Sequence, residues 1–549
     1  MARVQMKSYV SPTLVLLAFD WPEGGVYQDF LGFAISRKPG FQGEAESWLP
    51  NRLGFSGPAP PGKDFPTNTS PIQKFLWWDA RIDDEDRGKT FTYRAVPVRG
   101  TPDAPVLVEQ AATTLRVKIP QPVEGPIGTY FNRAVVSSQA FSRKFGQEPR
   151  GKKLHEALAW LANGLEQVIP DFLDRAESVE GAIYHLTDEE WVIPALERFG
   201  GQGSLVYNKT KKDQSNAAAV DRLEQRIEFL PRTKAAIMHN KFLVKTEGGK
   251  PVAVLTGSAN FTTGGLATQA NLLHTFRSRD LAALYQERKE LLEGDPTVAK
   301  TAAQARWSKV IPVGDARVRV FFSPEKKDAR VSIDTVVKAV EAARKSVLFC
   351  LFTPTDRALR EAIFEAGDRG RMMFGLINKL STKEPADGSG DAAARARVEL
   401  YHRSRQNRDV FAHDLYPRGG APGLFWWEVA TLPGDKAEFP VYIHHKFVVI
   451  DAETNEPTIF TGSANMSDNA LHRNDENLLE ITKCPRLAAM YLAELMRLYE
   501  HYRARAVWNR WKHKKEDDTY QLKHDARWAR AAYTKGTPQY KSRVNMVES

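Results

Sequence analysis

Apolar and polar positions alternate in short runs over the first 118 residues, a pattern typical of half-buried β-strands. Stretches rich in Pro and Gly separate these runs, so the region predicts a small all-β domain. The predicted strands cover residues 13–19, 29–35, 74–78, 90–96 and 104–108. Because no group of polar residues in this region indicates catalysis, we interpret it as a binding or spacer module.

After residue 120 the pattern changes to strands that alternate with helices, which is typical of an α/β fold. In the first half we expect a helix over 154–168 that ends near Pro170, then a strand over 181–186, a helix over 189–199 and a strand over 203–207. The second half repeats this order, with a strand over 345–352, a helix over 356–366 and a strand over 372–377. The chain therefore contains two copies of one α/β unit.

The two copies differ by an insertion. The stretch from Asn208 to His239 spans 31 residues, whereas the stretch from Asn378 to His444 spans 66. The added residues include the apolar run Leu424-Phe425-Trp426-Trp427. Such an insertion indicates either a lid or substrate-selecting loop, or a variable surface loop.

A short motif occurs once in each half and is the most specific feature of the chain. Each copy combines a His-x-Lys segment with a Gly-Ser-x-Asn turn: His239, Lys241, Ser258 and Asn260, then His444, Lys446, Ser463 and Asn465. The spacing from the histidine to the serine is 19 residues in both copies. Side chains alternate faces along a strand, so each histidine shares a face with its lysine. His445 points the other way and is interpreted as structural.

This set of residues suits a phosphodiester. The lysines neutralise the non-bridging phosphate oxygens, the serines and asparagines of the turns supply neutral donors to the same oxygens, and the glycines let the backbone approach. One histidine can attack phosphorus while the other protonates the leaving oxygen. Lysine is no cation ligand and few carboxylates lie near each histidine, so we expect neither a metal nor another cofactor.

The paired motifs resemble the His-x-Lys-x4-Asp and Gly-Ser-x-Asn signature of the phospholipase D superfamily, over roughly residues 120–510. The resemblance implies an α/β fold with two duplicated α/β/α lobes around a pseudo-twofold axis, and a phosphohistidine intermediate without metal. It gives Asp451 a supporting role, whereas the first copy holds Thr246 at that position. The run Thr90 to Val96 is similar to a late strand of fibronectin type III or immunoglobulin-like sandwiches.

These observations divide the chain into four expected parts. They are an immunoglobulin- or fibronectin-like β-sandwich over 1–118, a first phospholipase D-like lobe over 119–312, a second lobe over 313–505, and a basic aromatic tail over 506–549. Between residues 501 and 549, twelve Lys and Arg face five Asp and Glu, and among them lie Trp508, Trp511, Tyr520, Trp528, Tyr533 and Tyr540. The tail either contacts an anionic surface or packs its aromatic rings on the protein.

In the phospholipase D superfamily a downstream acidic or amide residue orients the histidine of its own half. The resemblance therefore implies that Gln269 lies beside His239 and that Glu476 lies beside His444. A neighbouring carboxylate favours the imidazolium form that a general acid requires. We accordingly expect His239 to be the nucleophile and His444 the acid. The alternative is that the first half is degenerate and the enzyme impaired.

The substrate is less well defined by the sequence. Two complete motifs in one chain favour a phospholipase D-type enzyme that hydrolyses or exchanges phospholipid headgroups. A nuclease or DNA/RNA phosphodiesterase is the alternative, favoured by the net charge of +10, the pI near 9.3 and an asymmetry of Gln269 and Glu476 that resembles tyrosyl-DNA phosphodiesterases. A non-catalytic scaffold that holds an anionic partner is a third interpretation.

Two cysteines and the lack of a recognisable secretion signal favour a cytoplasmic protein. Because the two motifs already supply an internal pseudo-dimer, we expect a monomer.

Overall fold

The computed structural model describes residues 1–60, 63–134, 141, 144–146, 149–211, 213–352, 354–378, 410–412, 443–514 and 521–548. Within these ranges no helix is both long enough and apolar enough to cross a membrane. The insertion that contains Trp426 and Trp427 lies outside the described residues.

An all-β region forms the N-terminal part of the chain, as the alternation of apolar residues predicts. One sheet has the order β1 (Gln5–Ser11), β2 (Leu14–Asp20), β9 (Leu76–Asp79). The other has the order β11 (Ala104–Leu107), β10 (Thr90–Thr101), β3 (Phe30–Lys38), β4 (Ser47–Trp48), with β12 (Thr113–Lys118) also paired to β10. Apolar side chains from both sheets, among them Phe19, Phe33 and Tyr93, share one core.

The first α/β sheet has eight strands. Their order is β13 (Val123–Glu124), β14 (Ile127–Phe131), β21 (Leu272–Phe276), β20 (Lys250–Gly257), β19 (Lys241–Glu247), β15 (Ser178–Ile183), β16 (Gln202–Asn208), β17 (Ile227–Arg232). Strands β15, β16 and β17 run parallel to one another, while β19, β20, β21 and β14 pair antiparallel. Consecutive residues such as Phe242 and Leu243 enter different cores, so both faces of this sheet are buried.

Helices cover both faces of this first sheet. One face packs on α6 (Arg279–Glu293). The other face packs on α2 (Lys152–Ala162), α3 (Leu165–Leu173), α4 (Val192–Arg198) and α5 (Ala217–Leu223). The single helix expected over 154–168 is therefore two helices, because Asn163 and Gly164 adopt left-handed φ values of 52° and 100°. Pro170 lies inside α3 instead of ending the helix.

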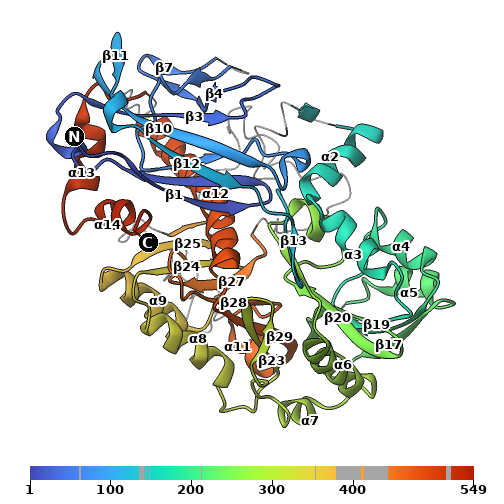
Figure 1. Ribbon diagram of the computed structural model, residues 1–549. Helices are drawn as coiled ribbons and strands as arrows, with labels where there is room; N and C mark the ends of the chain where they lie inside the picture. Colours follow the sequence, from blue (N-terminus) through green and yellow to red (C-terminus); the bar gives the residue numbers. More distant parts are fainter. Residues whose placement is uncertain are drawn as a thin grey trace.

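The second α/β sheet follows the same strand order. It runs β22 (Ile311–Val313), β23 (Ala316–Ser323), β29 (Asn474–Thr482), β28 (Thr458–Gly462), β27 (Lys446–Ile450), β24 (Ser346–Leu351), β25 (Met372–Ile377), β26 (Val410–Ala412). Helices α8 (Val331–Glu341) and α9 (Arg357–Asp368) pack on one face. The long helix α12 (Pro485–Lys514) covers the other face and also contacts β1 and β2, which joins the N-terminal region to this sheet (Figure 1). The expected boundaries at 312 and 505 fall inside β22 and α12.

Backbone segments cross between the two sheets at the histidine motifs. The short strand β18 (Ile237–Met238) precedes β19 of the first sheet, yet it pairs in parallel with Asn474 and Asp475 of β29 in the second sheet. A matching bridge joins Ala270 to Ile443. Each segment ahead of a histidine is therefore hydrogen-bonded to the opposite sheet, which brings both motifs to the contact between the sheets.

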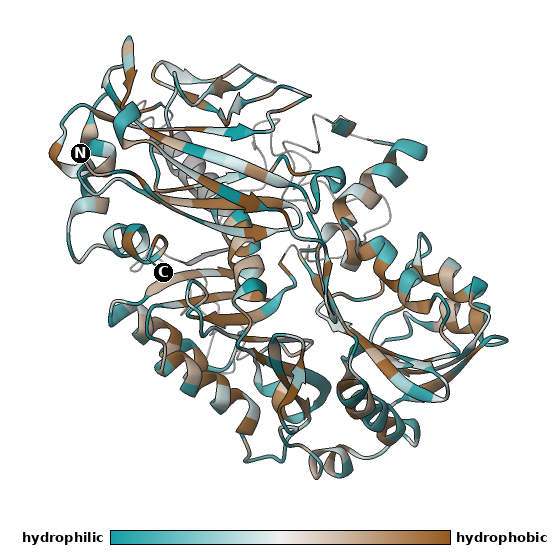
Figure 2. Ribbon diagram, in the orientation of Figure 1, coloured by the Kyte–Doolittle hydropathy of each residue, from teal (hydrophilic) through white to brown (hydrophobic). Residues whose placement is uncertain are grey.

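The described part of the C-terminal tail, residues 521–548, packs on the N-terminal β-region. It contains the 3-10 turn η8 (Ala526–Ala529) and the helices α13 (Arg530–Tyr533) and α14 (Pro538–Asn545). The Trp528 indole donates to the carbonyl of Phe30 (2.8 Å), and the Tyr533 hydroxyl donates to the carbonyl of Trp21 (2.6 Å). Apolar residues of this segment join the core beneath them (Figure 2). Of the two alternatives for the tail, Trp528 and Tyr533 therefore follow the second, because their rings pack on the protein. The alternative that these two rings contact an anionic surface is wrong.

Candidate active site

The two His-x-Lys segments lie at the contact between the sheets, with their side chains almost fully buried. His239 lies between β18 and β19, and Lys241 is the first residue of β19. His444 directly precedes β27, and Lys446 is the first residue of that strand. In each copy the lysine ammonium donates to the carbonyl of its own histidine, at 2.5 Å for Lys241 and 2.7 Å for Lys446. Within the described residues this is the only hydrogen bond that each ammonium makes, which leaves further N–H groups for an anion.

Each histidine is oriented by a residue of the opposite sheet. Nδ1 of His239 lies 2.7 Å from Oε2 of Glu476, and Nδ1 of His444 lies 2.9 Å from Oδ1 of Asn271. The expectation that Glu476 orients His444 is therefore wrong. The reason is the crossing of the backbone: the N–H of His239 donates to the carbonyl of Asp475 (2.9 Å), one residue before Glu476.

Gln269, the expected partner of His239, is also corrected. No hydrogen bond connects its side chain to either histidine in the described part of the chain, and its buried Oε1 has no partner there. Asn271 takes the place that corresponds to Glu476. The sequence contained a signal for this, because Asn271 follows Ser258 by 13 residues and Glu476 follows Ser463 by 13 residues.

The serines of the two turns support the orienting residues instead of facing a phosphate. The Ser258 hydroxyl donates to Asn271 Oδ1 (2.8 Å), and the Ser463 hydroxyl donates to Glu476 Oε2 (2.7 Å). Both hydroxyls also accept a backbone N–H, at 3.1 and 3.0 Å respectively. Because a hydroxyl has only one hydrogen to donate, the expected role of these serines as phosphate donors is corrected.

The asparagines of the turns keep unused hydrogen-bonding capacity. Oδ1 of Asn260 and Oδ1 of Asn465 are both buried without a partner among the described residues. Their expected contact with phosphate stays a prediction.

Asp451 and His445 have structural surroundings. Oδ1 of Asp451 accepts the N–H groups of Lys345 (2.7 Å) and Ser346 (3.0 Å), which ties the end of β27 to the start of β24. His445 is buried and lies between the rings of Phe131 and Phe447, with centroids at 5.7 and 5.2 Å. Both residues therefore support the strands around the site.

Four further residues shape the site and were not assigned a role from the sequence. The ring of Tyr184 lies beside His239 (4.9 Å between centroids), and the ring of Phe352 lies beside His444 (5.2 Å). Each ring directly follows an equivalent strand, β15 or β24. Asn208 and Asn378, which end the next strand of each half, accept the N–H of the residue before the histidine at 2.9 and 3.1 Å.

Burial and positive charge make both histidines weak bases. Burial lowers the pKa of His239 and of His444 well below the usual range, and the charges of Lys241 and Lys446 lower both further. In the free protein these surroundings favour the neutral form of His444 over the expected imidazolium form. Burial also lowers the pKa of Lys241 to about 7 and raises the pKa of Glu476 to about 7.

Among the described residues, no three His, Cys, Asp or Glu side chains are grouped as a metal site requires. The expectation of a metal-independent reaction stays a prediction.

Comparisons with known proteins match part of the chain to one family model. A family model described as "Cardiolipin synthase, PLD-like domain" matches residues 336–499. None of the curated proteins matches the chain. Among solved structures, phosphatidylserine synthase from Haemophilus influenzae is similar at 12% identity and a TM-score of 0.44, over 66% of this chain and 94% of that one.

Two further solved structures show lower TM-scores. Yeast tyrosyl-DNA phosphodiesterase is similar at 12% identity and a TM-score of 0.35, over 66% of this chain and 91% of that one. Polyphosphate kinase from Porphyromonas gingivalis is similar at 14% identity and a TM-score of 0.35, over 59% of this chain, which spans 46% of the kinase. The matching family model therefore shows a PLD-like domain over residues 336–499 of the chain.

Proposed function

We propose that the protein cleaves phosphodiesters through a covalent intermediate on His239, in a single site built by two duplicated α/β/α lobes around a pseudo-twofold axis. The crossed pair of hydrogen bonds, His239 with Glu476 and His444 with Asn271, carries this proposal. It makes each half incomplete without the other. The matching strand orders of the two α/β sheets support the duplication.

The hydrogen bonds on Nδ1 prepare His239 for attack. An ionised Glu476 can only accept, so Nδ1 of His239 carries the hydrogen and Nε2 keeps its lone pair. The carboxylate also stabilises the positive charge that the ring gains when Nε2 bonds to phosphorus. In the first step the bond from Nε2 to phosphorus forms and the bond from phosphorus to the leaving oxygen breaks.

His444 supplies the proton for the leaving oxygen. The amide of Asn271 donates through Nδ2 to the carbonyl of Gly265 (2.8 Å), which turns Oδ1 toward His444 and fixes the hydrogen on Nδ1. A bound phosphodiester brings negative charge beside Lys241 and Lys446 and so offsets the charge that keeps His444 neutral. His444 can then take up a proton on Nε2 and donate it. In the second step water attacks phosphorus, its proton goes to His444, and the bond to His239 breaks.

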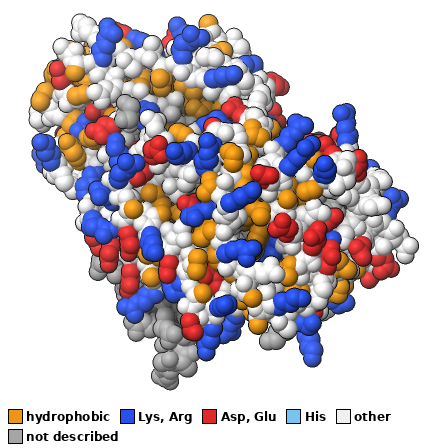
Figure 3. All heavy atoms as spheres, turned by 60° about the horizontal axis from the view of Figure 1, so that its bottom comes forward, with side chains coloured by type: hydrophobic (Ala, Val, Ile, Leu, Met, Phe, Trp, Pro, Cys, Tyr) orange, Lys and Arg blue, Asp and Glu red, His pale blue; other side chains and the backbone are white. Residues whose placement is uncertain are grey.

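A phospholipid headgroup is the substrate we favour, for hydrolysis or for exchange with an alcohol. The description of the matching family model, a cardiolipin synthase domain, supports this choice. On the face seen in Figure 3, Lys and Arg side chains are interspersed with Asp, Glu and apolar side chains and do not form a continuous basic surface. The net charge of +10 supports the second candidate, a nuclease or DNA/RNA phosphodiesterase. We place the activity in the cytoplasm, in a monomer.

The experiment uses two substrates in parallel, in EDTA. Phosphatidylcholine and phosphatidylglycerol vesicles are assayed for headgroup release, and single-stranded DNA is assayed for cleavage. We expect release from the vesicles, loss of this activity in His239→Ala, and an acid-labile phosphoprotein that forms in the wild type but not in His239→Ala.

A matched control is His155→Ala, because His155 is exposed on α2 and should leave the activity unchanged. Cleavage of DNA alone would replace the lipid substrate by nucleic acid. Anion binding without turnover of either substrate would favour the scaffold and contradict the enzyme.

A further inference from the structure

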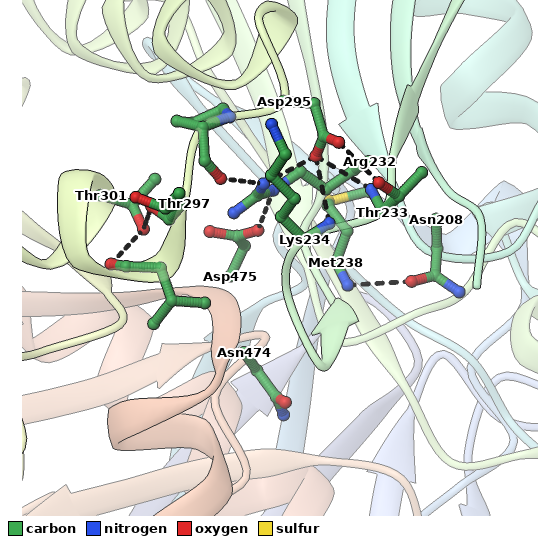
Figure 4. Close-up of polar contacts among 12 residues, drawn as sticks. Asn208, Arg232, Thr233, Lys234, Met238, Asp295, Thr297, Thr301, Asn474 and Asp475 are labelled. Atoms are coloured by element: carbon green, nitrogen blue, oxygen red, sulfur yellow. Dashed lines mark hydrogen bonds and ion pairs between the residues drawn. The ribbon is translucent and has the colours of Figure 1, made fainter. Parts of the chain in front are cut away.

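A buried group of charges joins the two lobes directly behind His239. Asp475 on β29 is fully buried, and two guanidinium groups of the first lobe hold its carboxylate. Nε of Arg232, at the end of β17, lies 2.7 Å from Oδ2, and Nη2 of Arg288, on α6, lies 2.9 Å from Oδ1. Figure 4 shows Arg232 between Asp475 and Asp295, whose Oδ1 accepts from Arg232 Nη1 (2.8 Å).

Asp475 is placed to fix both groups of the nucleophilic half. Its own carbonyl accepts the N–H of His239 (2.9 Å), and the next residue on β29 is Glu476. Its backbone also pairs with Met238 across the lobes. A shift of β29 against the first lobe would therefore move the carboxylate of Glu476 relative to the ring of His239.

The half of the site that contains His444 lacks such a group of buried charges. The residue that corresponds to Asp475 is Ala270, which precedes Asn271 and bridges to Ile443 through the backbone alone. A methyl side chain cannot pair with arginine. We call Asp475 with Arg232 and Arg288 the clasp. It lies where β18 pairs with β29, and the corresponding contact of Ala270 with Ile443 has no such charges.

We infer that Asp475 is a positioning residue for the nucleophile, and that Arg232 and Arg288 hold it so that the hydrogen bond between Glu476 and His239 keeps its geometry across the lobes. This inference rests on the proposed function. It goes beyond that function in assigning a role to three side chains that do not face the substrate. Breaking a buried pair leaves an uncompensated charge, so the clasp also contributes to stability, and the test must separate the two effects.

The test measures how fast phosphohistidine forms from bis(p-nitrophenyl) phosphate, which isolates the attack of His239 on phosphorus. p-Nitrophenol is acidic and leaves without help from a general acid, so the rate of the first turnover reports on the nucleophile. We expect Asp475→Asn to slow this step roughly 10- to 100-fold, because small displacements of a reacting group have effects of that size. KM should stay within about threefold, because the lysines that hold the phosphate are untouched.

Glu494→Gln is the matched control for the loss of a buried carboxylate. Glu494 lies on α12 and accepts from Ser11 (2.6 Å) and Arg497 (3.0 Å), and among the described residues it makes no hydrogen bond to the histidine motifs. It should lower the melting temperature while the rate of phosphohistidine formation per folded protein stays unchanged. Arg288→Gln removes one of the two arginines from Asp475 and should slow phosphohistidine formation as Asp475→Asn does. A variant that combines both substitutions should be no slower than the slower single variant.

The outcomes separate cleanly. A folded Asp475→Asn or Arg288→Gln protein that forms phosphohistidine at the wild-type rate overturns the positioning role alone. A wild-type protein that forms no phosphohistidine from any diester overturns the proposed function and this inference with it.

Discussion

The two halves of the site share their lysines and their strand positions but differ in the residues that orient the histidines. His239 has a carboxylate on Nδ1, whereas His444 has an amide. The carboxylate belongs to a strand clasped by two arginines, whereas the strand that carries the amide is joined across the lobes through the backbone. In the proposed mechanism the carboxylate therefore holds the ring of His239 in one orientation, with the hydrogen on Nδ1.

The other half of the site contains His444, the proposed general acid. In the proposed mechanism His444 gains a proton and loses it again within one turnover. A neutral amide orients the ring in both states. In the proposed mechanism, two symmetric positions therefore perform different steps, because one histidine is paired with a carboxylate and the other with an amide.

The shared lysines give the largest predicted effect and test whether the phosphate is held symmetrically. We expect Lys241→Met and Lys446→Met each to lower kcat by roughly 10²- to 10³-fold, because each removes a preorganised charge from a water-poor site. Exposed Lys250 gives the control Lys250→Met, which should have wild-type activity. A difference of more than tenfold between the two site variants would show that one half dominates phosphate binding.

Exchanging the orienting residues sharpens the comparison. We expect Glu476→Gln to slow cleavage roughly 10- to 100-fold for good and poor leaving groups alike, because it weakens the nucleophile. Asn271→Ala should slow a diester with an alkyl leaving group more than a p-nitrophenyl diester, because it disturbs the acid. Rates for a series of leaving groups measure both effects. Equal leaving-group dependence in the two variants would contradict our assignment of roles.

The buried carboxylate should also make stability depend on pH. Burial raises the pKa of Glu476 to about 7, above its value in the unfolded chain, so the folded state binds a proton more tightly. That stabilisation is present at low pH and is lost as the pH rises from about 4.5 through 7. Glu476 alone should contribute a loss on the order of 1–3 kcal/mol in the free energy of unfolding over this interval, while the lowered pKa values of His239 and His444 act in the opposite direction. In thermal melts from pH 5 to pH 8, the excess stability of the wild type over Glu476→Gln should therefore decrease as the pH rises, and a constant difference would refute the idea.

The aromatic rings give the smallest predicted effect. Tyr184 and Phe352 occupy corresponding places, so Tyr184→Phe makes the two walls alike. We expect a change of only a few-fold in KM, the size expected when one neutral hydrogen bond is lost, with kcat preserved. The reciprocal variant Phe352→Tyr serves as the control. A large loss of kcat in Tyr184→Phe would instead give its hydroxyl a part in the chemistry.

The sequence predicts those features that repeat along the chain. Strands in the N-terminal region and in the α/β halves lie near the positions that periodicity indicates, and the spacing of the motifs places Lys241 and Lys446 at equivalent strand starts. Periodicity failed at Asn163-Gly164, where two left-handed residues divide a continuous apolar pattern into two helices.

The partners of the histidines could not be predicted in the same way. Which lobe supplies an orienting residue depends on β18 pairing with β29, a contact between residues about 237 positions apart that leaves no periodic signal. Local spacing could have identified Asn271, since it matches Glu476 in distance from its serine, but the prediction gave this place to Gln269. The serines were misassigned because a hydroxyl suits a phosphate and a buried carboxylate equally well.

Residues 521–548 have a consequence for how the chain matures. Trp528 stacks on Phe75 (5.3 Å between centroids) and lies against Phe30 (5.1 Å), so together with Tyr533 it completes an aromatic core whose other aromatic members occur in the first hundred residues. During synthesis on the ribosome, more than 400 further residues are added after those early strands before residues 521–548, which cover them, are made. A nascent chain of this protein thus carries an unfinished aromatic surface for most of its translation, which makes it a natural client for a chaperone that shields such surfaces.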